Sequence, residues 1–447
     1  MSDELKAQRG QFFTVNDRVQ AVMLDLIQTS KDGKVLEPSS GEGHLVVALE
    51  EAGFTDITSV EFDPDLKALS KSQPVRGSFF DYLAGTDTRY DCIFGNPPYV
   101  GWKSLEQEQK ENPNLLAVKK DYSDKANLYY LFIDRCIDAL VSGGEIVFIV
   151  PKEWLYTSSA LPLRVKMLTT GALTHVVDCG EEKLFPDADV PAIVIFRFQK
   201  GLHTAKTQYS LSLDNAVAGK WEERVIEETG DRLIFLDPDT ASVIDGWGLL
   251  EDYLSVKVGI VSGADPIFRV TDPSLYEPEG LKQYLTTKGM EWFIDVNHVD
   301  AEADLPPRIK DFLLSHKEKL ISRRITKFDE GNWWKYGAIR NRDAMLSDAD
   351  RFYSFVKTRS VSPFFLCDEA ELFSGGVLGI FVKDELPEGM TVESVVELLN
   401  SDFYRGLFEM MQLTTGNKLS LQPSTLGTLP FPNTAEQALN VTQITRN

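Results

Sequence analysis

The chain has 447 residues, of which 43% are hydrophobic and 26% are charged, a composition typical of globular proteins with two or three domains. Residues Met1 to Gly10 are polar, and no apolar run approaches the roughly 18 residues of a membrane span, so a cytoplasmic protein without a signal peptide or membrane contact is expected. The net charge of −22 argues against binding of nucleic acid by the whole surface, although a local basic cleft is compatible with it. The four cysteines form no CxxC pair and the five histidines form no HExxH motif, so no disulfide framework and no metal site are predicted.

The first 200 residues alternate between short apolar runs and segments of helical periodicity, beginning with a helix capped by Asn16 or Asp17. This alternation predicts an α/β fold with a doubly wound, mostly parallel, seven-stranded Rossmann-like sheet. The last two strands are close in sequence, which favours an antiparallel pair at one edge. The predicted strands are Lys34–Leu36, Ile57–Val60, Val75–Phe80, Cys92–Phe94, Glu145–Val150, His175–Asp178 and Ala192–Phe198.

The pattern changes after Lys200. Residues 208–245 are polar and acidic and are interpreted as a linker, which gives a first domain of residues 1–245. Residues 246–432 are richer in aromatic and basic residues, and we expect a second domain of mixed α+β structure there. Residues 433–447 are predicted to be a flexible tail.

A glycine-containing turn, Glu37-Pro38-Ser39-Ser40-Gly41-Glu42-Gly43, joins the first strand to a helix. Such a turn lets the backbone approach a ligand. Glu61 lies 18 residues beyond Gly43 (61 minus 43), close to the usual spacing for an acid that accepts hydrogen bonds from ribose hydroxyls. With only two glycines and an acid ahead of them, the turn fits a cofactor with a charged amino-acid end better than a dinucleotide. A plain strand-to-helix connection remains the alternative.

The fourth strand runs into the sequence Gly95-Asn96-Pro97-Pro98-Tyr99. Two prolines make an extended, stiff loop that carries an amide and an aromatic ring at the carboxyl end of a strand, where open α/β sheets bind ligands. This combination suits a planar group with an amino substituent, such as a nucleobase, and a simple proline-stiffened connection is the alternative. Asp81 follows the third strand and is either an acceptor for an adenine amino group or a helix cap.

In order and spacing, these motifs resemble those of the N6-adenine DNA methyltransferases that use S-adenosylmethionine, in the gamma (Taq-type) arrangement with a C-terminal target-recognition domain. The resemblance covers roughly the first 200 residues. The matching stretches are Gly10-Gln11-Phe12-Phe13-Thr14, Leu36 to Gly43, Val60-Glu61-Phe62-Asp63-Pro64, Asp81, Gly95 to Tyr99, Asn127-Leu128-Tyr129, Gly143 to Phe148 and Leu184-Phe185-Pro186.

The resemblance implies roles on the cofactor side. Thr14 would cover the methionine end of S-adenosylmethionine, Glu61 would bind the ribose and Asp81 the adenine. The turn would hold the methionine end from below, and Asn96 would border the cofactor as well. The expected cofactor-binding residues are therefore Thr14, Glu37, Ser39, Gly41, Gly43, Glu61, Asp81 and Asn96.

The resemblance also implies a mechanism without a metal or a covalent intermediate. Asn96 and the carbonyl of Pro97 would accept hydrogen bonds from the amino group of the target adenine, so that its lone pair points at the methyl group. The base would be flipped out of double-stranded DNA, with Tyr99 stacked on one face and Phe185 on the other.

A basic segment in the second half of the chain is the candidate DNA surface. Residues 317–342 contain eight basic and three acidic residues, which gives a net charge of +5 (eight minus three), with aromatic residues interleaved. A solvated charged face beside a tryptophan pair in the core is the alternative. The expected DNA-binding residues are Arg323, Arg324, Lys327, Trp333, Lys335, Arg340 and Arg342.

The leading hypothesis is a monomeric, site-specific adenine methyltransferase, acting either in a restriction–modification or related defence system or as an orphan methylase. The cofactor motif begins near residue 10, so a fused N-terminal nuclease is not expected, and a cognate endonuclease would act separately. One alternative is an RNA or protein-glutamine N-methyltransferase. Another is a non-catalytic binding or DNA-mimic protein on the same fold, suggested by the acidity.

Overall fold

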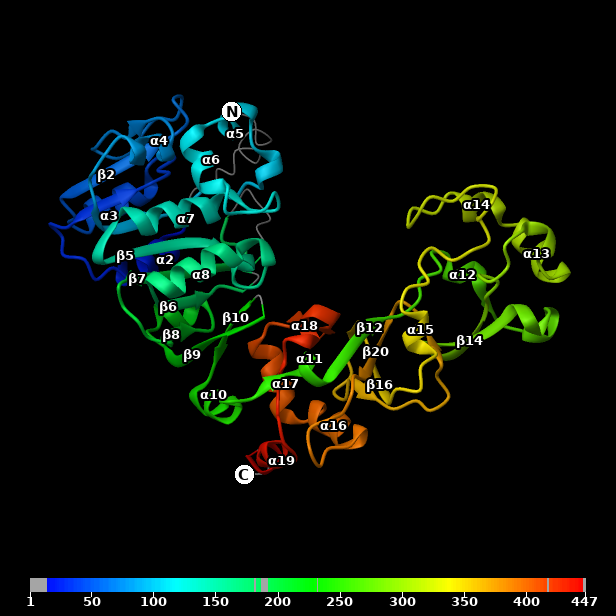
Figure 1. Ribbon diagram of the computed structural model, residues 1–447. Coiled ribbons are helices and arrows are strands. Elements are labelled where there is room, and N and C mark those ends of the chain that lie inside the picture. Colours follow the sequence, from blue (N-terminus) through cyan, green and yellow to red (C-terminus); the bar gives the residue numbers. More distant parts are fainter. Residues whose placement is uncertain (1–13, 181, 186–191, 231, 416–417, 445–447) are drawn as a thin grey trace. The chain divides into compact units, whose positions relative to one another are not determined.

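The computed structural model describes residues 14–180, 182–185, 192–230, 232–415 and 418–444 (Figure 1). The chain divides into two compact units, Met1–Ala241 and Ser242–Asn447, and each is described by itself. The sequence placed this division near residue 245. Residues Gly10 to Phe13 of the first motif, and Pro186, lie outside the described residues.

The first unit is built on a ten-stranded sheet. Neighbouring strands from β3 through to β5 run parallel, whereas β7 is antiparallel to both β5 and β6. Across the sheet the order is β10 (Arg232–Leu236), β9 (Glu222–Thr229), β8 (Lys206–Ser210), β6 (Gly171–Asp178), β7 (Ile193–Lys200), β5 (Leu140–Pro151), β4 (Tyr90–Gly95), β1 (Lys34–Glu37), β2 (Asp56–Glu61) and β3 (Val75–Arg76).

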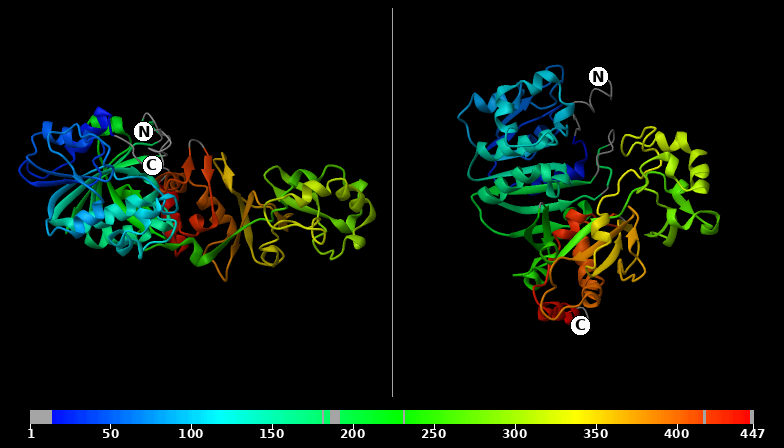
Figure 2. Two further views of the ribbon diagram at one scale, coloured as in Figure 1. Left: turned by 90° about the horizontal axis from the view of Figure 1, so that it is seen from above. Right: turned by 45° about the vertical axis from the view of Figure 1, so that its right-hand side comes forward.

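Helices cover both faces of this sheet, as Figures 1 and 2 show. Successive side chains of β5 point to opposite faces, so Ile146 and Phe148 belong to one apolar cluster and Val147 and Ile149 to another. This is why the strand is apolar without a break, as expected for a strand buried on both sides. The first cluster includes α4 (Phe79–Ala84), α6 (Pro113–Lys119), α7 (Leu128–Ala139) and α8 (Leu161–Thr170), and the second includes α2 (Asp17–Asp25), α3 (His44–Glu51) and α9 (Leu213–Val217).

Three expectations require correction. The acidic segment 208–245 is not a linker, because β9 and β10 lie in it and, with β8, extend the sheet beyond the seven strands expected. The third strand is shorter than predicted, and the chain turns into α4 at Phe79. The predicted flexible tail contains α19 (Ala435–Ile444), whose Val441 is buried.

The second unit combines small sheets with short helices. Its four-stranded sheets have the orders β12-β20-β16-β18 and β13-β15-β14-β19, and β17-β22-β21 and β11-β23 form smaller ones. The strands are β11 (Gly248–Leu249), β12 (Leu254–Val258), β13 (Arg269–Val270), β14 (Leu281–Thr286), β15 (Gly289–Ile294), β16 (Arg351–Phe355), β17 (Lys357–Thr358), β18 (Phe364–Phe365), β19 (Leu372–Phe373), β20 (Val377–Val382), β21 (Thr414–Thr415), β22 (Lys418–Ser420) and β23 (Pro430–Phe431). The main helices are α13 (Pro307–Leu314), α14 (Lys317–Ile321), α15 (Arg342–Met345), α16 (Val392–Leu399) and α17 (Asp402–Met410). In the described part of the chain, no helix is long and apolar enough to cross a membrane.

Candidate functional site

The turn after β1 adopts the backbone conformation for which its glycines are suited. Gly41 and Gly43 have φ angles of 56° and 86°, a left-handed region that disfavours other residues. The amide of Ser40 donates to the carbonyl of Val60 (2.9 Å), which ties the turn to β2. Gly43 then caps α3. The turn therefore passes close to the end of β2 before the helix begins.

Glu61 ends β2 and is held by two backbone amides. The amide of Gly41 donates to one carboxylate oxygen (2.6 Å), and the amide of Asp63 donates to the other (2.7 Å). Burial raises the pKa of Glu61, and the two amides act in the opposite direction. Each oxygen keeps a further lone pair, so an oriented acceptor remains available to a ligand.

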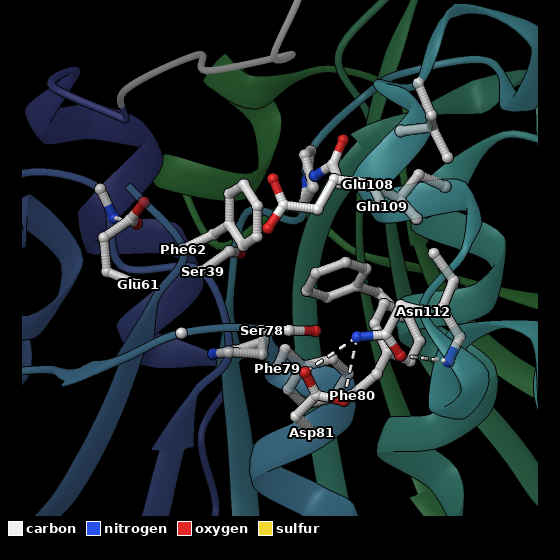
Figure 3. Close-up of a pocket in the computed structure, with 18 of the residues that line it drawn as sticks. Ser39, Glu61, Phe62, Ser78, Phe79, Phe80, Asp81, Glu108, Gln109 and Asn112 are labelled. Atoms are coloured by element: carbon white, nitrogen blue, oxygen red, sulfur yellow. Dashed lines mark hydrogen bonds between the residues drawn. The ribbon is translucent and has the colours of Figure 1, made fainter. Parts of the chain in front are cut away.

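A cavity of about 320 Å³ lies at this edge of the sheet (Figure 3). Several residues predicted to bind the cofactor meet in its wall because they follow neighbouring strands at their carboxyl ends. The predicted residues that line it are Ser39, Gly41, Glu61, Asp81 and Asn96.

The sequence predicted that Asp81 would directly follow the third strand. It lies instead in the first turn of α4. Its carboxylate accepts hydrogen bonds from the side-chain amides of Asn112 (2.9 and 2.8 Å) and Asn114 (2.8 Å). Figure 3 shows the contact between Asp81 and Asn112 at the cavity wall. The carboxylate is therefore oriented by side chains from a segment about 30 residues further along the chain.

The Asn96 loop leaves β4 beside this cavity. The side-chain amide nitrogen of Asn96 donates to the hydroxyl of Thr14 (3.0 Å), and the backbone carbonyl of Asn96 accepts from the hydroxyl of Ser39 (3.1 Å). These bonds connect three of the predicted motifs. They also orient the amide of Asn96 by its nitrogen, which fixes the direction of its oxygen.

Tyr99 and Phe185, the predicted stacking pair, lie close together. The hydroxyl of Tyr99 donates to the carbonyl of Ile149 (2.9 Å), which fixes its ring. The ring centroids of Tyr99 and Phe185 are 6.2 Å apart at an angle of 74°, an edge-to-face contact. Two rings in this arrangement do not form a parallel slot for a base, so a sandwich between them stays a prediction.

Three predicted cofactor residues lie outside the cavity wall. Thr14 is buried behind Asn96, and Gly43 belongs to the helix cap. Glu37 is 1% exposed, and one of its carboxylate oxygens has no hydrogen-bond partner among the described residues. Burial raises its pKa well above the usual value. Burial of the side chain therefore favours the neutral form of the Glu37 carboxyl group.

Several wall residues were not found from the sequence. Phe62 lines the cavity and is 40% exposed. Because it directly follows the predicted ribose-binding residue Glu61, its position in the sequence could have marked it as a wall residue. Glu108, Gln109 and Asn112 come from the segment between β4 and α7, where no motif marks them. Figure 3 shows the side chains of Glu108 and Phe62 pointing toward one another across the cavity.

The basic segment of the second unit separates into structural and surface residues, which corrects part of the predicted DNA-binding set. Trp333 is fully buried, and its indole donates to Glu302 (2.9 Å). Arg342 donates to the buried carboxylate of Asp295 (2.9 Å). Trp333 therefore belongs to the core, and the half-buried Arg342 is engaged by a carboxylate inside the fold.

Arg323 is also structural. Its guanidinium donates to the carbonyls of Leu320, Ser262, Trp333 and Lys335 at 2.6–3.0 Å, and it lies over the ring of Phe328 at 3.7 Å. Burial lowers its pKa to about 10. Because its donors bind carbonyls within the unit, Arg323 holds the loop after α14 and is not available for phosphate.

The predicted residues that remain at the surface are Arg324, Lys327 and Arg340, all exposed. In the described part of the chain none of the three forms an ion pair, whereas Lys335 contacts Asp300 (3.3 Å). Ile325 and Ile339, 44% and 46% exposed, lie next to them in the sequence. Within the same described residues, no cluster of three His, Cys, Asp or Glu side chains could hold a metal ion.

Comparison with known proteins finds a family match within the first unit. Residues 49–185 match the model of the Eco57I restriction-modification methylase family. This part of the chain is therefore similar to the methylases of that family. The matched range includes Glu61, the Asn96 loop and Phe185, whereas Ser39 and Gly41 of the cavity wall precede it.

Relatives match beyond this range. The type II methyltransferase M.HindII of Haemophilus influenzae is 26% identical, over 96% of this chain and 90% of its own length. The type II methyltransferase M.TthHB8I of Thermus thermophilus is 35% identical over 40% of this chain and 42% of its own. Among solved structures, the type IIL restriction-modification enzyme MmeI, solved in complex with DNA, matches with a TM-score of 0.55 and 12% identity, covering 95% of this chain and 65% of that chain. The match to M.HindII thus extends over both units of this chain.

The contact between Gly95 and Glu37 provides a test of how the methylase motifs pack. A Cβ atom at Gly95 would lie 2.6 Å from a carboxylate oxygen of Glu37. We therefore expect Gly95→Ala to reduce the free energy of unfolding by about 1–3 kcal/mol, measured by denaturant titration. Gly101→Ala is the matched control, because a Cβ atom there meets nothing within 4 Å. Equal stabilities of the two variants would contradict this packing.

The buried Glu37 predicts a pH dependence of stability. The pKa of Glu37 is raised in the folded state. Its contribution to the free energy of unfolding is therefore fully present below the pKa of the unfolded state and is lost as the pH rises through the pKa of the folded state. Glu37→Gln has no proton to lose, and its free energy of unfolding should rise relative to that of the wild type between pH 5 and pH 8. The gain should be about 1.4 kcal/mol for each pH unit by which the two pKa values of Glu37 differ. Parallel stability curves in urea titrations would show that Glu37 is ionised when folded.

Proposed function

We propose that this protein is a sequence-specific DNA methyltransferase that transfers a methyl group from S-adenosylmethionine to N6 of an adenine. One observation carries the proposal: Asn96, the candidate acceptor for the target amine, lines the same cavity as Ser39, Gly41, Glu61 and Asp81. A methyl donor bound by Ser39, Gly41, Glu61 and Asp81 would therefore be adjacent to an amine bound by Asn96.

The cavity has the chemistry that S-adenosylmethionine requires. Its volume of about 320 Å³ lies in the range of small-molecule sites. Glu61 offers an oriented carboxylate for ribose hydroxyls, and Phe62 offers an apolar face for a planar base. Asp81 offers an acceptor for an exocyclic amino group. The cofactor supplies an electrophilic methyl group on a positively charged sulfur when it is bound.

The residues of the Asn96 loop orient the nucleophile. An exocyclic amine is a poor nucleophile because its lone pair is delocalised into the ring. Two acceptors, the side-chain oxygen of Asn96 and the carbonyl of Pro97, favour a tetrahedral nitrogen whose lone pair points toward the methyl group. The bond from Asn96 to Thr14 supports this role, since it holds the amide by its nitrogen.

Access to the target nitrogen requires that the adenine leave the duplex, at a cost of a few kcal/mol. Tyr99 stacks on the extruded base and offsets part of this cost, and its ring is held by the bond to Ile149. Phe185 contacts the other face after a change in the angle between the two rings, which are edge to face without a base.

DNA is bound by the second unit through Arg324, Lys327 and Arg340. These three cations are exposed, and they suit contacts to phosphates. The overall charge of −22 restricts binding to such a local surface. Since the relatives named above are type II methyltransferases, we place this enzyme on the modification side of a restriction–modification system, with an endonuclease that acts separately.

Asn96→Ala should lower the rate of methyl transfer by about 10²-fold or more, because one acceptor of the target amine is lost. The measurement is transfer of a labelled methyl group from S-adenosylmethionine to mixed-sequence duplex DNA, with the methylated base identified by mass spectrometry. Binding of S-adenosylhomocysteine is measured in parallel because Asn96 also borders the cavity.

Asn215→Ala, on α9, is the control and should retain wild-type activity. Full transfer by Asn96→Ala would contradict the mechanism. Methylated cytosine, RNA or glutamine as the wild-type product would contradict the substrate.

Arg324→Ala, Lys327→Ala and Arg340→Ala should each weaken DNA binding and reduce the slope of log K against log salt concentration by about 1, since each removes one phosphate contact. Fluorescence anisotropy with duplex DNA at several salt concentrations measures the slope. Lys282→Ala, which removes an exposed lysine on β14, should leave the slope unchanged. Unchanged slopes in all three variants would place the DNA surface elsewhere.

A further inference from the structure

Residues 100–128, between the Asn96 loop and the start of α7, form a long insertion that is called the excursion below. Backbone hydrogen bonds join its two ends, and this paired part is called the neck. The amide of Trp102 donates to the carbonyl of Ala126 (2.9 Å), and the amide of Leu128 donates to the carbonyl of Val100 (2.7 Å). Beyond this neck the chain contains α5 (Gln107–Lys110) and α6. The excursion begins one residue after Tyr99, so the predicted base-binding loop and the part of the cavity wall that includes Glu108 and Asn112 belong to one continuous piece of chain.

This excursion is tied to the cofactor side at Asp81. One carboxylate oxygen of Asp81 accepts from both Asn112 (2.9 Å) and Asn114 (2.8 Å), and the other accepts from Asn112 alone (2.8 Å). A carboxylate oxygen has two lone-pair positions. The first oxygen is therefore saturated, and the second keeps one acceptor position. Because Asp81 lines the cavity, that position is available to a ligand there.

The amide of Asn112 is fixed at both ends. Its oxygen accepts from the backbone amides of Asn114 (2.9 Å) and Leu115 (3.0 Å) and so caps α6. Its nitrogen is left to point at Asp81. Leu115, one turn into the helix, is buried against the main core. The donor that orients Asp81 is thus positioned by a helix cap that is itself anchored in the core.

We propose that Asn112 and Asn114 are positioning residues that orient Asp81 so that the cavity selects a purine with a 6-amino group. This inference rests on the proposed use of S-adenosylmethionine. It adds the reason why the cavity would select a 6-amino purine over a 6-oxo purine. With one oxygen saturated by two amide donors, the carboxylate presents a single oriented acceptor, which suits an amino group. A 6-oxo group would place an acceptor against that acceptor, which is unfavourable.

A purely structural tie between α4 and α6 is the competing explanation. Asp81 is exposed, and exposed hydrogen bonds add little to stability, so stability alone does not require three bonds to one carboxylate. The two explanations differ in one measurable quantity. A structural tie affects folding equally whichever ligand is offered, whereas a positioning role affects the ratio of affinities for two ligands that differ at one atom.

The test is isothermal titration of the full-length protein with S-adenosylhomocysteine and with S-inosylhomocysteine, which carries a 6-oxo group. Asn114→Ala removes one donor. Asn112→Asp keeps an acceptor that caps α6 but replaces the donor by a second carboxylate. Gln107→Ala is the matched control, because this exposed amide of the same excursion bonds only to Glu111 in the described structure (2.7 Å).

We expect the wild type and Gln107→Ala to prefer the adenosyl ligand by tenfold or more. Asn114→Ala should reduce this preference by about 3- to 10-fold and Asn112→Asp by more, through weaker binding of the adenosyl ligand. The ratio does not depend on the folded fraction of each preparation.

The outcomes separate the two proposals. If the wild type binds neither ligand, the proposed function fails. If the wild type prefers the adenosyl ligand and both variants keep the wild-type ratio, the function stands and the positioning role is overturned. Equal binding of both ligands by the wild type overturns it as well.

Discussion

A buried hydrogen bond from the Gly41 amide to the Glu61 carboxylate fixes the edge of the sheet at which the cavity lies. It joins the turn after β1 to the end of β2 at the point where the sheet opens into the cavity. Gly41 makes the bond possible because its φ of 56° turns the amide toward the neighbouring strand. The ends of β1 and β2 are thereby fixed, and the Asn96 loop packs against them through Ser39 and Thr14.

The proposed cofactor site and the proposed base-binding loop are connected by one continuous segment of the chain as well as by their contacts. The Asn96 loop continues directly into the excursion, which lines the cavity and contacts Asp81. Movement of the excursion would therefore change both the cofactor side and the loop that begins at Asn96. The neck at Val100 and Leu128 limits such movement, since it holds both ends of the excursion by backbone hydrogen bonds.

The second unit uses its basic residues in two ways. Arg323 and the half-buried Arg342 donate to carbonyls and to a buried carboxylate within the unit, and they stabilise a loop-rich fold with short strands. Arg324 and Arg340 are at the surface. Adjacent arginines such as 323 and 324 thus have different roles, because one side chain points into the unit and the other away from it.

The sequence by itself determined the alternating α/β order, the strands of the central sheet and the motifs at their carboxyl ends, because these depend on local periodicity and on parallel strands ending at one edge. It did not determine that residues 208–245 extend the sheet, since β9 is polar and acidic and the apolar β10 is short. It also did not distinguish Arg323 from Arg324, or mark Asn112 as a partner of Asp81. These were decided by tertiary structure, because burial and side-chain contacts between distant segments leave no periodic trace in the chain.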